Sequence, residues 1–245
     1  MLSDSRIKKI KLFLSSINFK TQNYTLIDKA LTHSSYIFEN NFENLEHYER
    51  LEFLGDAVLK LAVSKYLFFK YPAYPEGQLT KIRGIIVSDE FLAKLALQIS
   101  LQEYINLGPH EEKTGGRQRP SILACVFEAL LGALYEDGQL DNIYIFLENL
   151  YEQYVDDIDS NMCVYNVKAL LQEYTQSQTK ELPEYTVTRE EGKDHDKSYE
   201  VTVSYSGTVL GIGQGKSKKD AEKDAALKAS IKLGLIVGGK CQKLL

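Results

Sequence analysis

The stretch His47-Tyr-Glu-Arg-Leu-Glu-Phe-Leu-Gly-Asp56 decides how the first part of this chain folds, because its apolar residues recur at helical rather than strand spacing. It carries three carboxylates, Glu49, Glu52 and Asp56. At ~100° per residue, their spacing places all three on one helix face. Like charges this close are unfavourable unless a cation holds them together, so the pattern predicts a metal site. A solvated acidic face is the alternative.

Gly55, inside the same stretch, favours the metal site over the solvated face. A glycine in a helix interior costs ~1 kcal/mol and usually marks close packing or function. We therefore expect either close packing or a functional role at this point.

The composition is typical of a soluble globular protein with one large domain or two smaller ones: 245 residues, 44% hydrophobic and 26% charged. No apolar run approaches the ~20 residues that span a bilayer, and the N-terminus lacks a signal peptide, so we expect a cytoplasmic protein with no membrane partner. The three cysteines, Cys125, Cys163 and Cys241, are far apart and lack zinc spacing. Reduced thiols are therefore expected, with no Cys-based metal site.

The chain divides into a helical part and a mixed part. We predict a first domain over residues 1–155, a linker over 156–165, a second domain over 166–235 and a C-terminal tail over 236–245. On this basis we expect helices over residues 26–38, 49–71, 88–101, 121–135, 140–155, 167–176 and 217–233. We expect strands over residues 184–189, 199–205 and 208–212. The net charge of −5 is uneven: residues 166–245 carry +2 and the rest −7.

The last predicted helix begins with three lysines, Lys216, Lys218 and Lys219. Backbone N–H groups and the helix dipole already favour an anion at a helix N-terminus, so the lysines add to a phosphate site. On its own a lysine-rich helix start is a weak signal, and a solvated patch explains it equally well. The phosphate site is supported only when the lysine-rich helix start is considered together with the α-β-β-β-α order of the predicted elements.

With the α-β-β-β-α order of its elements, the second domain resembles the double-stranded RNA-binding domain family. The resemblance implies that Gln172 and Glu173 meet ribose 2′-hydroxyls in one minor groove, that the turn containing His195 meets the next, and that the three lysines bridge the phosphates between them. Ala169 stands where the family often carries a hydroxyl, so one contact of this kind is expected to be missing. The implied partner is duplex RNA, read by its shape rather than its sequence.

Five motifs in the first part share one order and spacing with a known family. They are Leu31-Thr-His-Ser-Ser-Tyr36, the Glu49–Asp56 run, Glu76-Gly-Gln-Leu-Thr-Lys-Ile-Arg83, Gly108-Pro-His-Glu-Glu-Lys-Thr-Gly-Gly-Arg117 and Pro120-Ser-Ile-Leu-Ala-Cys-Val-Phe-Glu128-Ala-Leu-Leu-Gly132. Together they resemble the endonuclease domain of bacterial ribonuclease III. The resemblance implies two domains, an all-α endonuclease domain followed by an α+β double-stranded RNA-binding domain. The implied activity is hydrolysis of duplex RNA, including precursors of ribosomal RNA and structured messenger RNA, with no small-molecule substrate.

The resemblance also assigns roles to the acids. Glu52 and Glu128 ligate a metal ion, Asp56 completes the cluster and orients metal-bound water, and Glu49 lies at its edge. Hydrolysis of a phosphodiester needs a hydroxide nucleophile and relief of negative charge, which Mg²⁺, or Mn²⁺ as a substitute, supplies when hard oxygen ligands hold it.

Cys125 departs from the family pattern, which has Asp three residues before the second-helix Glu. A thiol with a pKa of ~8.5 is a poor ligand for Mg²⁺. Three interpretations follow: an engineered or naturally weakened site, a protein that binds duplex RNA without cutting it, or a site with a different metal balance. Because the other four acids are present, we favour an enzyme of reduced activity. A non-catalytic RNA-binding regulator is the rival.

Three other residues carry predictions. The resemblance implies a homodimer in which Phe53, exposed beside the acids, fills a socket in the other subunit. Glu76 reaches the site from the partner, or else simply begins a helix. His33, next to Ser34, has no acidic third member for a nucleophilic triad, so we expect it to serve in capping or core packing.

Overall fold

The structure is a computed structural model that describes residues 2–42, 46–192, 197–238 and 240–241. The chain forms two compact units, Met1–Val155 and Asp156–Leu245, which we describe one at a time. Within the described residues, no helix combines the length and the apolar character needed to cross a bilayer.

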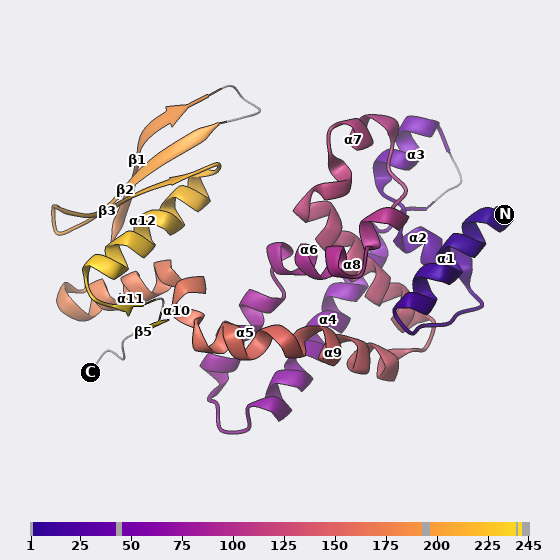
Figure 1. Cartoon of the computed structure of the whole chain (residues 1–245), viewed down its shortest axis with the longest axis horizontal. Helices are drawn as coiled ribbons and strands as arrows, with labels where there is room; N and C mark the ends of the chain where they lie inside the picture. Colours follow the sequence, from indigo (N-terminus) through magenta and orange to yellow (C-terminus); the bar gives the residue numbers. More distant parts are fainter. Residues whose placement is uncertain (1, 43–45, 193–196, 239, 242–245) are drawn as a thin grey trace. The chain divides into compact units, whose positions relative to one another are not determined.

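The first unit is built from helices, as the periodicity predicts (Figure 1). They are α1 (Asp4–Ser16), α2 (Tyr24–Ala30), α3 (Ser34–Asn40), α4 (Glu49–Lys70), α5 (Glu76–Ile86), α6 (Asp89–Gln98), α7 (Pro109–Lys113), α8 (Pro120–Glu136) and α9 (Leu140–Ser160), with 3₁₀ turns η1 (Leu101–Tyr104) and η2 (Gly116–Gln118).

The helix expected over residues 26–38 is in fact two helices, α2 and α3. The chain leaves the helical path at Thr32, which forms an isolated bridge with Asn106, and His33 then caps the start of α3. The helical spacing of apolar residues runs through this interruption, so periodicity alone does not reveal it. Capping is one of the two roles that the sequence predicts for His33.

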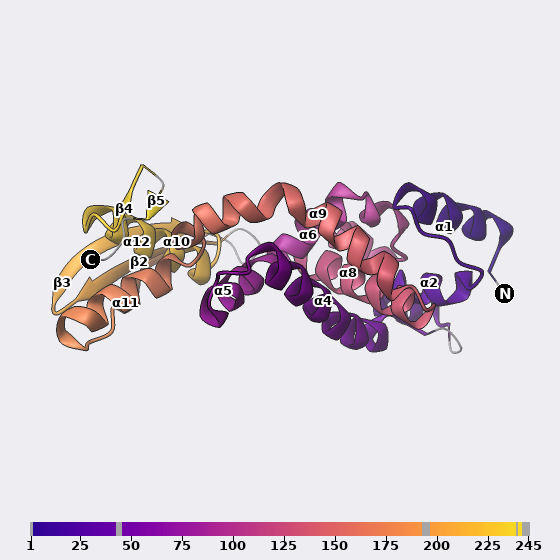
Figure 2. The ribbon, with the colours of Figure 1, turned by 90° about the horizontal axis from the view of Figure 1, so that it is seen from below.

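The core of this unit forms around α8, which packs against α4 and α6 (Figures 1 and 2). Residues on every side of α8 are buried, including Leu123, Phe127 and Leu131. A helix that is apolar all round is stable only when neighbours cover it, and α8 is such a helix. The core therefore fixes the helix that carries Cys125 and Glu128.

The second unit is an α+β fold with the predicted α-β-β-β-α order. Its main elements are α11 (Val167–Thr179), β1 (Glu184–Glu191), β2 (Ser198–Tyr205), β3 (Thr208–Gly215) and α12 (Lys218–Lys232). The strands form an antiparallel sheet in the order β1-β2-β3. Val201 and Val203 of β2 are fully buried in one core with α11 and α12. A Cβ on Gly213 would lie 2.1 Å from the backbone nitrogen of Ala225, so α12 and β3 are packed with their backbones almost touching.

Three features of this region differ from expectation. The segment expected as a linker is helical, because α9 continues to Ser160 and α10 covers Met162–Tyr165. The expected tail contains a short pair of strands, β4 (Ile236–Val237) and β5 (Lys240–Cys241), and Ile236 is buried in the core. Cys163 is disulfide-bonded, so the expectation of three reduced thiols is wrong. α10 packs against β5, a contact that the distance along the sequence does not reveal.

Candidate active site

The helices α4 and α8 cross with their backbones in contact, and two glycines make this possible. A Cβ on Gly55 would lie 1.8 Å from the carbonyl oxygen of Glu128, and one on Gly132 would lie 2.2 Å from the carbonyl oxygen of Leu51. No side chain fits at either point. The glycine in the acidic helix therefore marks a close approach, as the sequence predicts, and the helix that approaches it carries Glu128.

The crossing brings acids from the two helices close enough to affect one another. Glu128 is half-buried, and its pKa is raised to about 7, with burial as the largest cause. The charges of Asp56, Glu52 and Asp89 contribute to this rise, whereas the charge of Lys60 opposes it. Near neutral pH this carboxyl is therefore poised between its protonated and ionised forms.

Two of the three acids of α4, Asp56 and Glu49, differ in their surroundings. Asp56 accepts a hydrogen bond from Lys60 Nζ at 2.7 Å, one helical turn away. Glu49 is exposed, and its carboxylate lies 3.8 Å from His47 Nδ1. Glu49 is thus at the solvent edge of the group, whereas Asp56 has a cation beside it and acts on Glu128.

Cys125 is half-buried and its thiol is neutral. Burial, the hydrogen bond to Glu52 and the charge of Glu52 raise its pKa to about 12. Tyr48, buried at the start of α4, also hydrogen-bonds to Cys125, and burial holds the pKa of its hydroxyl well above the usual range. The thiol therefore lies between Tyr48 and Glu52 as an uncharged hydrogen-bonding group.

Two residues at this site were not found from the sequence. Asp89, in the first turn of α6, raises the pKa of both Cys125 and Glu128. Its only signal was the helix start Ser88-Asp-Glu, where acids are common for capping reasons. Tyr48 lies inside the quoted run, but an aromatic residue there is typical of core packing.

The chemistry of the donor set suits a hard divalent cation, because the charges of Asp56 and Glu52 raise the pKa of Glu128, and a positive charge beside all three would stabilise them. Among the described residues, however, no three Asp, Glu, His or Cys side chains already converge as a metal cage. The hydrogen bond from Lys60 turns the Asp56 carboxylate toward a neighbour on its own helix. Binding a metal would require Asp56 to exchange that contact for the ion.

Phe53 lies on α4 with 83% of its surface exposed, an unusual state for a phenyl ring. Beside it is a hollow of about 650 Å³, whose lining includes Leu26, Leu54 and Glu136. A projecting ring next to a hollow is an arrangement that two copies could satisfy mutually. Glu76 is exposed at the start of α5 and accepts a hydrogen bond from Thr80 Oγ1 at 2.7 Å.

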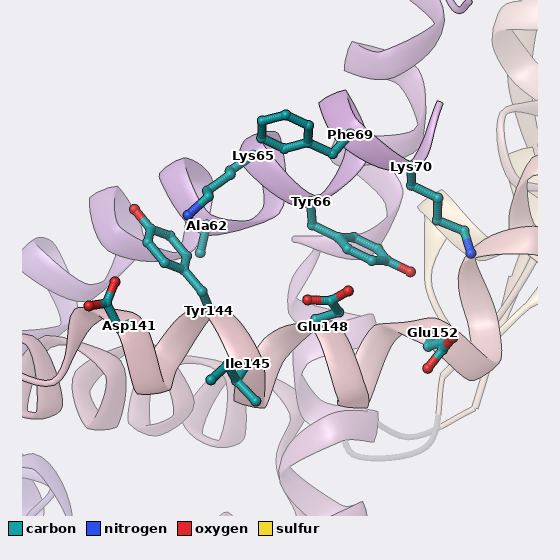
Figure 3. Close-up of a pocket in the computed structure, with 10 residues that line it drawn as sticks. All are labelled: Ala62, Lys65, Tyr66, Phe69, Lys70, Asp141, Tyr144, Ile145, Glu148 and Glu152. Atoms are coloured by element: carbon teal, nitrogen blue, oxygen red, sulfur yellow. The ribbon is translucent and has the colours of Figure 1, made fainter. Parts of the chain in front are cut away.

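A separate groove of about 530 Å³ lies between α4 and α9 (Figure 3). Lys65 stands over the ring of Tyr144 at 3.7 Å, and Phe69 is exposed at the edge. None of the acids near the helix crossing lines this groove. It is therefore distinct from the candidate active site.

Four of the six candidate RNA-binding residues of the second unit lie on the expected helices. Lys218 and Lys219 open α12, Lys216 follows β3, and all three are exposed. Ser217 caps α12 by accepting a hydrogen bond from the Asp220 backbone N–H at 3.1 Å. The side chains of Gln172 and Glu173 are exposed on α11, which packs against α12. His195 lies outside the described residues.

Comparison with known proteins defines the class of each unit. Residues 23–154 match the family described as ribonuclease-III-like, and residues 167–233 match the double-stranded RNA binding motif. Ribonuclease 3 of Bacillus licheniformis is 44% identical over 228 residues, which cover 93% of this chain and 91% of that protein. Ribonuclease 3 of Listeria welshimeri is 46% identical over 211 residues, which cover 86% of this chain and 92% of that protein.

A solved structure gives the same result for the first unit. The nuclease domain of ribonuclease III from Campylobacter jejuni superposes with a TM-score of 0.54 at 35% identity, covering 59% of this chain and 96% of that domain. A nuclease domain followed by a duplex RNA-binding domain is the class that these matches define. The chain belongs to the ribonuclease III family, and it is an endoribonuclease acting on double-stranded RNA. The family is metal-dependent.

Proposed function

We propose that Glu52, Asp56 and Glu128 hold the catalytic metal, that this metal is Mg²⁺, and that Mn²⁺ can replace it. The observation that carries the proposal is the pKa of Glu128, raised to about 7 by burial and by the charges of Asp56 and Glu52. A bound divalent ion would provide a hydroxide nucleophile near neutral pH and offset charge on the scissile phosphate. Glu49, at the exposed edge, is placed to face RNA or a second ion.

Each acid then has a separate task. Glu128 supplies an oxygen ligand once its proton leaves, so the site is most competent above about pH 7. Asp56 accepts a hydrogen bond from Lys60 and would serve as an oxygen ligand to the ion. Glu52 is oriented by the thiol of Cys125.

We propose that Cys125 weakens catalysis without abolishing it. A neutral thiol contributes a hydrogen bond but not the hard, ionised oxygen that Asp would provide. The rival function, a regulator that binds duplexes without cutting, depends on the same residue. We favour the enzyme because the chain still carries Glu52 and Asp56 on α4 and Glu128 on α8, the helix that crosses it.

We further propose a homodimer in which Phe53 of each copy enters the hollow beside Phe53 of the other. The exposure of the ring and the volume of the hollow support this arrangement. The Campylobacter jejuni nuclease domain has a region involved in dimer formation. A contribution of Glu76 to the partner's site has no support in this chain beyond its exposure, and its hydrogen bond with Thr80 suits a helix start.

For RNA binding we propose Lys216, Lys218 and Lys219 as the phosphate contacts, with Gln172 and Glu173 meeting ribose hydroxyls. The assignment of His195 stays a prediction. Precursors of ribosomal RNA and structured messenger RNA are the proposed substrates, and the cytoplasm is the proposed location.

The decisive experiment is a cleavage assay on a long RNA duplex at increasing Mg²⁺, comparing the wild type with Cys125→Asp and Glu128→Gln. Cys125→Asp should raise the rate and lower the Mg²⁺ concentration required, and Glu128→Gln should abolish cleavage while leaving duplex affinity unchanged. If the wild type binds the duplex but never cuts it at any Mg²⁺ or Mn²⁺ concentration, the regulator is the correct function. If Glu128→Gln cuts normally, the proposed metal site is wrong.

A further inference from the structure

The segment from Leu31 to Ser35 joins three separate parts of the first unit. Its backbone pairs with Asn106: the Asn106 N–H donates to the Leu31 carbonyl at 2.8 Å, and the His33 N–H donates to the Asn106 carbonyl at 3.1 Å. The Asn106 side-chain amide donates to Thr32 Oγ1 at 2.9 Å. The segment is therefore fixed to the loop before α7.

The imidazole of His33 extends this hydrogen-bond network to Ser35. Its Nδ1 accepts the Ser35 backbone N–H at 3.1 Å and lies 2.8 Å from Ser35 Oγ. Ser35 Oγ in turn accepts the Gly108 N–H at 2.9 Å, so its own proton is directed to Nδ1. An acceptor of two donors carries no proton, so this arrangement requires neutral His33.

The same segment is attached to the start of the acidic helix. The Thr32 carbonyl accepts the Tyr48 N–H at 3.1 Å, and the rings of His33 and Tyr48 lie 5.6 Å apart between centroids. The Tyr48 carbonyl then accepts the N–H of Glu52 at 2.9 Å. A continuous set of contacts therefore runs from His33 to the backbone of a proposed metal ligand.

We propose that neutral His33 is a positioning residue for the active site, holding the α7 loop through Ser35 and the first turn of α4 through Tyr48. This inference rests on the proposed acidic site. Protonation of Nδ1 replaces an acceptor with a donor, which breaks both bonds to Ser35 and releases Gly108. The His33 side chain thus makes the geometry of the site dependent on pH, independently of any acid that binds metal.

The surroundings of His33 support a neutral ring in the folded protein. Burial lowers its pKa below the ordinary 6.5, an effect that outweighs Glu111, whose charge raises it. The charges of Arg119 and His47 also lower the pKa, and the charge of Glu49 raises it. Since the folded pKa is below the unfolded value, the stabilising effect is fully present above pH 6.5 and is lost as the pH falls through the lowered pKa.

The test measures amide hydrogen exchange of Ser35 and Gly108 in the full chain, corrected for the intrinsic effect of pH. In the wild type, protection should fall by up to about tenfold between about pH 7.5 and about pH 5.5, because the opened state gains a proton that the closed state excludes. His33→Asn keeps an acceptor at the cap and does not titrate, so its protection should be the same at both pH values. His110→Asn, at an exposed histidine nearby, should behave as the wild type.

Cleavage kinetics provide the second measurement. His33→Ala should lower kcat by roughly ten- to a hundredfold with little change in KM, because a misplaced ligand impairs chemistry more than duplex binding. His33→Asn should restore much of that loss. Wild-type protection that does not change with pH, or a wild-type kcat in a folded His33→Ala, would overturn the proposal. Failure of the acidic site itself is distinguishable, because Glu128→Gln would then retain cleavage while the exchange results stood.

Discussion

Replacing Glu128 by Gln should stabilise the first unit at alkaline pH. The folded pKa of about 7 lies above the ordinary 4.5, so the folded state holds a proton that the unfolded chain loses. This favours folding below pH 4.5, and the benefit is lost as the pH rises through 7. A shift of this size corresponds to about 3 kcal/mol for a fully buried group. Glu128 is only half-buried, so screening by solvent reduces the expected effect to about 1.5 kcal/mol.

Calorimetry of the full chain without divalent cations can measure this. At about pH 8, Glu128→Gln should raise the Tm of the first unit by roughly 3–6 °C, and the gain should shrink toward zero at about pH 4.5. Glu148→Gln, at an exposed acid of α9, serves as the control and should change the Tm little. Added Mg²⁺ should raise the Tm of the wild type but not that of Glu128→Gln. If the two proteins have the same Tm at both pH values, Glu128 is not held among other negative charges, and the electrostatic basis of the proposed site fails.

Three further predictions concern packing, assembly and RNA binding. Gly55→Ala should destabilise the first unit by more than about 3 kcal/mol, because the added methyl group would meet backbone rather than a movable side chain. Urea unfolding measures this, and a midpoint close to that of the wild type would show that α4 and α8 can separate. Phe53→Ala should weaken the dimer by about 2 kcal/mol, which is roughly thirtyfold in the Kd measured by sedimentation. If the dimer is unchanged at low micromolar concentration, Phe53 does not lie in the interface. Charge reversal at Lys216, Lys218 and Lys219 should reduce the affinity for duplex RNA. The slope of log affinity against log salt concentration should become shallower by about one unit for each lost contact. Wild-type affinity at every salt concentration would contradict the assignment of these lysines to phosphate.

The sequence was a reliable guide wherever local spacing determined structure. The long helices α4, α6, α8 and α9, the three strands and the close packing at Gly55 follow from periodicity and from the cost of a helical glycine, whereas α1 and α7 were not among the expected helices. The contribution of Asp89 could not be predicted, because its proximity to Glu128 arises from the packing of α6 against α8. The break between α2 and α3 was missed for a related reason, since its hydrogen bonds are to Asn106, far along the chain.

The structure also explains how Cys125 can occupy a position where related enzymes are expected to carry Asp. Glu128 already lies near the charges of Asp56, Glu52 and Asp89, and its pKa is raised to about 7. A carboxylate at position 125 would add another negative charge and raise that pKa further, destabilising the metal-free fold. The thiol, with its pKa raised to about 12, adds no charge and still donates a hydrogen bond to Glu52. If the proposed metal site is correct, we expect Cys125 to favour stability without metal over affinity for metal. Cys125→Asp should shift that balance, with a lower Tm in the absence of Mg²⁺ and a larger rise in Tm when Mg²⁺ is added.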